Sequence, residues 1–72
     1  MMERVKQLIG NNIRNQRKER GFSQEELAEK ASLHRTYIGS VERGERNISI
    51  ENIVSIARAL RILPKELLEG IE

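Results

Sequence analysis

The stretch 24–43, which reads QEELAEKASLHRTYIGSVER, contains two short apolar patterns separated by only a few residues. The apolar residues recur at helical spacing and are Leu27, Ala28, Ala31, Ile38 and Val41. Two helices joined so tightly are expected to cross at a steep angle, as in a helix-turn-helix. A close crossing needs a small side chain in the first helix, which Ala28 supplies. The stretch therefore predicts a helix-turn-helix unit.

Helical spacing continues on the N-terminal side of this unit. It predicts a first helix from about Glu3 to Arg20, which Gly21 would end. Ser23 and Glu26 have the spacing of a capping box, which would open the second helix.

On the C-terminal side, Ser49 is expected to cap a fourth helix that runs to Leu60. Pro64 suits the first position of a last short helix. The apolar residues of that helix are Leu67, Leu68 and Ile71. The sequence thus predicts an all-α fold, a compact five-helix domain that occupies residues 1–72 as a single domain.

Composition excludes several classes of site. The 72 residues include no cysteine, no aspartate and one histidine, His34, so a disulfide, a metal site and a catalytic constellation find no support. We expect no cofactor, no small-molecule ligand and no enzyme activity. No apolar run reaches the length of a membrane span, which predicts a soluble cytoplasmic protein.

Charge is unevenly distributed along the chain. Residues 1–20 hold six basic and two acidic residues, a local charge of +4, whereas the whole chain has a net charge of +2. Such asymmetry is a weak indication of a polyanionic partner. A solvated charged face explains it equally well.

Two segments resemble a known family. Residues 21–28 (GFSQEELA) and 41–44 (VERG) are similar to the phage-repressor-type (Cro-like, XRE) helix-turn-helix family, whose fold is that of the lambda-repressor DNA-binding domain. The likeness extends over essentially the whole chain. Within that family, residues 34–49 (HRTYIGSVERGERNIS) resemble the controller proteins of restriction-modification systems.

The resemblance implies a transcription regulator that binds double-stranded DNA sequence-specifically as a homodimer. A controller protein would regulate its own gene and a neighbouring restriction gene. One alternative is another regulator of the same family, such as a phage, plasmid or antitoxin-type repressor. A second is an interaction module that has the fold but does not bind DNA.

This chain departs from the family pattern at two positions. Ser32 stands where the turn usually has glycine, which costs roughly 1 to 2 kcal/mol if the backbone there is left-handed. His34 stands where the third helix is often capped by Ser or Thr, and histidine is a poorer cap.

The third helix, from about His34 to Arg43, is the predicted reading helix. Arg35 and Thr36 lie in its first turn, which faces the base edges in this geometry, and Ser40 lies on the same face as Thr36. Arginine can donate two hydrogen bonds to guanine, and threonine can contact thymine. Ordinary solvated surface is the alternative for all three.

Other residues are expected to contact the DNA backbone and set the register. They are Gln24, Tyr37, Arg43, Arg46 and Asn47. Gln24 begins the second helix, whose positive end suits a phosphate. A plain core role for Tyr37 and a solvated charge at Arg46 remain open. The resemblance assigns Arg17 and Glu42 to an internal salt bridge.

The region of about 50–71 is the expected dimerisation region. Its candidate contact residues are Ile50, Val54, Leu63, Leu67 and Leu68, although some of them would only close the core. Two-fold pairing would place the reading helices about 34 Å apart, facing a palindromic operator. Protein concentration would then be the input, with RNA polymerase as a further partner.

Overall fold

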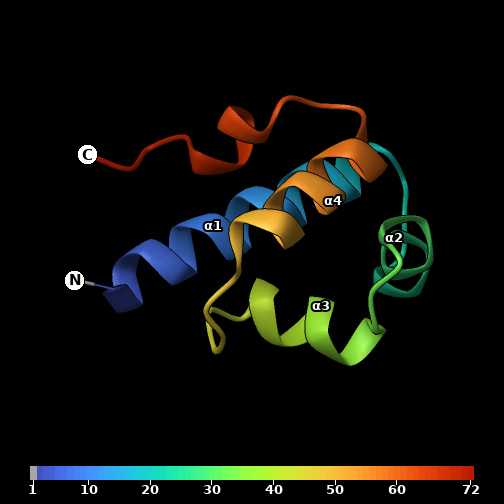
Figure 1. Cartoon of the computed structure of the whole chain (residues 1–72), viewed down its shortest axis with the longest axis horizontal. Coiled ribbons are helices and arrows are strands. Elements are labelled where there is room, and N and C mark those ends of the chain that lie inside the picture. The colour runs from blue at the N-terminus through green and yellow to red at the C-terminus, as the bar shows by residue number, and fades with distance from the viewer. Residues whose placement is uncertain (1) are drawn as a thin grey trace.

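A computed structural model describes residues 2–72, which form four α-helices and one short 3₁₀-helix (Figure 1). The elements are α1 (Met2–Glu19), α2 (Gln24–Ala31), α3 (Arg35–Glu42), α4 (Ile50–Leu60) and η1 (Pro64–Leu68). The all-α prediction is confirmed for these residues. None of the helices in this part of the chain is both long and apolar enough to cross a membrane.

The fifth predicted helix is corrected to a 3₁₀-helix. Pro64 opens it as expected, but it spans only five residues and ends before Ile71. The amide group of Asn12 donates to the carbonyl oxygens of Leu67 and Glu69, each at 3.0 Å. Gly70 then turns the chain with a φ of +90°. These carbonyls are bonded to α1 instead of to a continuing helix, so the last segment lies against α1.

The helices pack around one core. α2 contacts both α3 and α4, α1 contacts α3, and η1 closes against α1 and α4. In Figure 1 the start of α1 and the C-terminus lie at the same end of the longest axis, and α3 stands apart from η1 on the opposite side of α1 and α4. The buried apolar residues are Ile9, Ile13, Leu27, Ala28, Ala31, Ile38, Val41, Ile53, Ile56, Ala57, Leu60 and Leu67. Every apolar residue predicted to hold the helix-turn-helix together belongs to this core.

α1 and α3 approach each other closely at Gly10. A Cβ atom at this position would collide with the backbone carbonyl oxygens of Val41 and Glu42. Because these are backbone atoms, no side-chain rotation can relieve the collision. The position of α3 relative to α1 therefore depends on glycine at position 10.

The turn between α2 and α3 contains a residue in the left-handed region, at the position where the family usually has glycine. Ser32 has φ 59° and ψ 42°, and its N–H group bonds to the carbonyls of Ala28 and Glu29, which closes α2. Serine bears the steric cost that glycine would avoid there. His34 is the N-cap of α3 with extended backbone, and its side chain makes no capping hydrogen bond.

Candidate nucleic-acid interface

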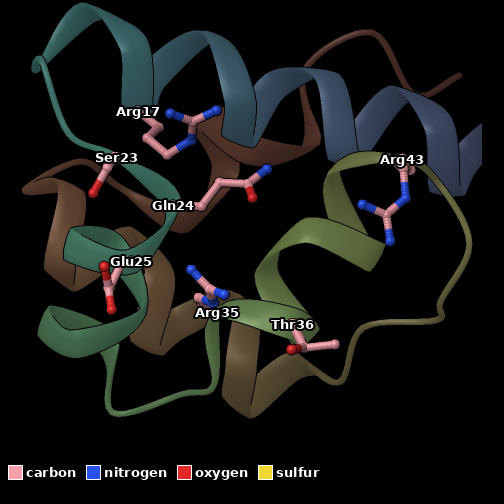
Figure 2. A pocket seen from close by; sticks show the side chains of 7 residues that line it. All are labelled: Arg17, Ser23, Gln24, Glu25, Arg35, Thr36 and Arg43. Carbon is pink, nitrogen blue, oxygen red and sulfur yellow. The ribbon is translucent and has the colours of Figure 1, made fainter.

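A hollow opens where α1, α2 and α3 meet, and we call it the α2–α3 hollow (Figure 2). It is lined by Arg17, Ser23, Gln24, Glu25, Arg35, Thr36 and Arg43. The two helices of the motif thus bring predicted backbone-contacting and base-reading side chains to one surface.

Two further hollows adjoin α3. The α3-loop hollow is lined by His34, Thr36, Tyr37, Ser40, Arg43, Glu45 and Arg46. The α1–α3 hollow is lined by Gln7, Asn11, Arg14, Glu42 and Arg43. Arg43 borders all three hollows, so it joins them into one surface along α3.

The start of α2 is held by the predicted capping box. Ser23 Oγ accepts from the N–H of Glu26 at 3.0 Å, and the N–H of Ser23 donates to Glu26 Oε1 at 2.8 Å. The second hydrogen bond lowers the pKa of Glu26 below its ordinary value. The cap sets the first turn of α2 so that Gln24 lies at the α2–α3 hollow (Figure 2).

The carboxylate of Glu42 connects three helices. Arg17 donates to it from Nε at 2.6 Å and from Nη2 at 3.0 Å, and Gln24 Nε2 donates at 3.0 Å. Arg17 also donates from Nη1 to the carbonyl of Phe22 at 2.8 Å. The hydrogen bonds to Glu42 raise the pKa of Arg17, although burial opposes the shift. The ion pair implied by the family resemblance is therefore present, and Arg17 is committed to it.

Gly39 lies beside this network. A Cβ atom there would stand 3.3 Å from Gln24 Oε1 and 3.2 Å from Arg43 Nη1. The absence of a side chain thus leaves space for two polar side chains that line the α2–α3 hollow. From the sequence alone, a glycine inside this helix indicates close approach of either DNA or another helix.

The first turn of α3 presents Arg35 and Thr36 to solvent, and Figure 2 shows both at the rim of the α2–α3 hollow. Ser40 is half-buried, and its hydroxyl donates to the carbonyl of Tyr37 at 2.9 Å. With its proton engaged in this way, Ser40 has only acceptor lone pairs to offer a ligand.

Tyr37 is tied to two neighbours. Its hydroxyl accepts from Asn52 Nδ2 at 3.0 Å, and the guanidinium of Arg46 lies 5.5 Å from the centre of its ring. The hydroxyl proton of Tyr37 can still be donated. Asn47 is exposed between α3 and α4, and it does not line any of the three hollows.

Glu45 is a residue of this surface that sequence reasoning missed. Its Oε2 accepts from Arg43 Nε at 3.0 Å, and both side chains are more than half exposed. This contact raises the pKa of Arg43 and lowers that of Glu45. Only its place two residues after Arg43 could have indicated the pairing.

The predicted dimer-contact residues have different degrees of exposure. Ile50 is 76% exposed, Leu63 58% and Leu68 38%, whereas Val54 is half-buried. Leu67 is fully buried in the core of the domain, so its assignment to the dimer contact is corrected. The 3₁₀ geometry turns Leu67 inward and leaves Leu68 at the surface.

No group of three or more His, Cys, Asp or Glu side chains within residues 2–72 is arranged to hold a metal ion. Along the exposed side of α3 the surface groups hydrogen-bond donors and cations, together with the carboxylates of Glu25 and Glu45. Such donors and cations are the groups that recognise phosphates and base edges.

Comparisons with known proteins agree with this geometry. A helix-turn-helix family model matches residues 13–67. Control protein C.SmaI of Serratia marcescens is 45% identical over 64 residues, which cover 89% of this chain and 76% of the relative. Control protein C.BamHI of Bacillus amyloliquefaciens is 44% identical over 70 residues, which cover 96% and 86%.

Among solved structures, the restriction-modification controller protein C.AhdI from Aeromonas hydrophila superimposes with a TM-score of 0.85 at 47% identity. The match covers 86% of this chain and 94% of that one. The chain belongs to the helix-turn-helix family of transcription regulators, in the group of restriction-modification controller proteins.

Proposed function

We propose that this protein is a sequence-specific regulator that binds double-stranded DNA as a homodimer and controls a restriction-modification operon, including its own gene. The observation that carries the proposal is the exposed pair Arg35 and Thr36, which start a helix fixed to α1 and α2 through Glu42. A reading helix needs this combination, because discrimination depends on side chains held at a defined position. The cytoplasm is its place of action.

In this proposal, three side chains contact the bases directly. Arg35 would donate two hydrogen bonds to a guanine, and Thr36 would contact a neighbouring base through its hydroxyl or methyl group. Ser40, whose proton is already donated to Tyr37, would accept a hydrogen bond from a base amino group or a bridging water.

Backbone contacts would hold the reading helix in register. Their residues are Gln24, Tyr37, Arg43, Arg46 and Asn47. Arg46 and Tyr37 support each other through the cation–π contact, so both would face the same phosphate strand. Gln24 would bridge the DNA and the Glu42 network, which couples backbone contact to the position of α3.

Dimerisation would use the exposed apolar residues Ile50, Leu63 and Leu68, with Val54 at the edge. Ile71, which is 40% exposed, is a further apolar residue at the surface of the C-terminal segment. Two-fold symmetry would place two reading helices about one turn of DNA apart on a palindromic operator. Operator occupancy would then follow protein concentration, and a bound dimer could contact RNA polymerase.

The test is a footprint on the DNA upstream of the gene for this protein, at micromolar protein. A protected palindrome is the expected result, and the lack of any protected site would refute autoregulation. A neighbouring methyltransferase and endonuclease gene would support the controller role. Other neighbours would favour a phage, plasmid or antitoxin-type repressor.

Two substitutions distinguish base reading by Arg35 from contact with the DNA backbone by Arg46. Arg35→Ala should cost about 1 to 3 kcal/mol on the preferred site and relax the preference for one base pair. Arg46→Gln should weaken binding to all sequences alike. An unchanged sequence preference in Arg35→Ala would refute the base-reading role of Arg35, whereas a folded wild-type protein that binds no duplex DNA would support an interaction module.

The proposed dimer contact can be tested by measuring the oligomeric state of variants in sedimentation. Leu63→Glu should shift the protein toward monomer while its helical content is retained, because Leu63 is exposed. Leu67→Ala should instead destabilise the fold by about 2 to 5 kcal/mol, since that side chain fills the core. A Leu63→Glu variant that stays dimeric would refute this contact surface.

A further inference from the structure

The outward face of α1 carries a stripe of basic and amide side chains between two exposed glutamates. Its members are Arg4, Gln7, Asn11, Arg14, Asn15 and Lys18, all of them exposed. Their spacing of three and four residues places them on one side of the helix. The two acidic residues of α1, Glu3 and Glu19, stand at its ends. The stripe is therefore a cationic and amide-rich surface that matches a polyanion in charge.

Arg14 contributes a positive charge that its neighbours only partly balance. Its Nε lies 3.7 Å from Glu42 Oε1, but Glu42 already accepts two hydrogen bonds from Arg17. One carboxylate thus faces two guanidinium groups. The side chain of Arg17 is 10% exposed and that of Arg14 is 45% exposed, so the excess charge reaches solvent at Arg14.

The stripe adjoins the surface assigned above to DNA. Asn11 and Arg14 line the α1–α3 hollow together with Arg43, which also borders the other two hollows. Gly44 lies against α1, because a Cβ atom there would stand 3.1 Å from the Cα atom of Gln7. This part of α1 and the end of α3 are therefore adjacent.

We propose that Asn11 and Arg14 form a phosphate-binding site on α1 that works with Arg43 and holds the sugar-phosphate backbone of the DNA beside α3. The proposal rests on the proposed DNA binding and adds a third element to it. Asn11 would donate its amide N–H and Arg14 its guanidinium N–H groups to the same phosphate. The contact would set the position of the domain on DNA without reading sequence.

The test compares Arg14→Gln with Arg58→Gln in titrations of operator DNA and unrelated duplex DNA at several salt concentrations. Arg58 is an exposed arginine of α4 that lines none of the three hollows, so its replacement makes the same change of charge elsewhere. A dimer loses two contacts, so Arg14→Gln should bind both DNAs about 25-fold more weakly, or about fivefold per subunit. The slope of log K against log salt should fall by about 1.8. Arg58→Gln should match the wild type.

Two further variants distinguish a direct effect on DNA binding from an effect on folding. Asn11→Glu places a carboxylate in the hollow at an exposed position and should weaken binding to all duplexes. Arg14→Lys keeps the charge and should recover most of the affinity. Circular dichroism reports whether each variant is folded.

If wild-type protein binds DNA and both Arg14→Gln and Asn11→Glu retain its affinity and salt slope, the α1 site is refuted and the proposed function stands. If the wild type binds no duplex DNA, the proposed function fails first. A loss confined to operator DNA would also refute the site, because it would make Arg14 a base-reading residue.

Discussion

The guanidinium of Arg17 and the carboxylate of Glu42 face each other between α1 and α3 and share two hydrogen bonds, of 2.6 and 3.0 Å. Arg17 is 9% exposed and Glu42 3%. Since Gln24 donates to the same carboxylate, the pair also holds the start of α2. The relative position of the two motif helices therefore depends on one buried charge pair.

Removing one member of this pair should be costly. Glu42→Gln leaves the charge of Arg17 buried without its counter-ion, so we expect the free energy of unfolding to fall by about 3 to 5 kcal/mol. Urea denaturation measures this free energy of unfolding. The double variant Arg17→Met/Glu42→Leu should lose much less stability, because it leaves no unpaired charge buried. A loss below about 1 kcal/mol in Glu42→Gln would show that the pair is unimportant for stability.

The left-handed turn residue offers a stabilising substitution. Ser32→Gly should raise the free energy of unfolding by about 1 kcal/mol, since glycine adopts the φ of 59° without steric cost. Ser55→Gly, inside α4, is the matched control and should lower stability by about 0.5 to 1 kcal/mol. Thermal denaturation of both variants checks the opposite signs. A destabilised Ser32→Gly variant would contradict the predicted effect of this turn.

The capping box of α2 should make stability depend on pH. The pKa of Glu26 is lowered by the hydrogen bond from the N–H of Ser23. Its contribution is therefore complete above the ordinary value of 4.5 and is lost as the pH falls through the lowered pKa of the folded state. Melting temperatures of the wild type and Glu26→Gln should differ at neutral pH and converge in acid. A constant difference across the range would contradict this assignment.

The contact between Glu45 and Arg43 should lower the affinity for DNA. Glu45 places a negative charge on the proposed phosphate-facing surface and accepts a hydrogen bond from Arg43 at 3.0 Å. Glu45→Gln should therefore bind DNA about twofold to fivefold more tightly with no measurable loss of stability. Glu29→Gln, on α2, is the control with the same change of charge. Weaker binding by Glu45→Gln would mean that the carboxylate itself contacts DNA, for example at a cytosine amino group.

Features that depend on residues within one or two helical turns could be predicted from the sequence alone. The capping box of Ser23 and Glu26, the cap at Ser49 and the place of Pro64 as the first residue of η1 all agree with what local chemistry predicted. The spacing of apolar residues identified the core of the helix-turn-helix, because one side of each helix must face the interior. The exposed position of Arg35 at the start of α3 follows from the same local pattern.

The roles of residues that meet from distant parts of the chain became clear from the three-dimensional arrangement of the helices. Leu67 and Leu68 are equivalent in the sequence, yet one fills the core and the other is exposed, because Asn12 holds the carbonyl of Leu67 against α1. The need for Gly10 arises from the carbonyls of α3, and the excess charge of Arg14 arises from Glu42. These relationships join residues far apart in the chain, so spacing within a helix carries no information about them.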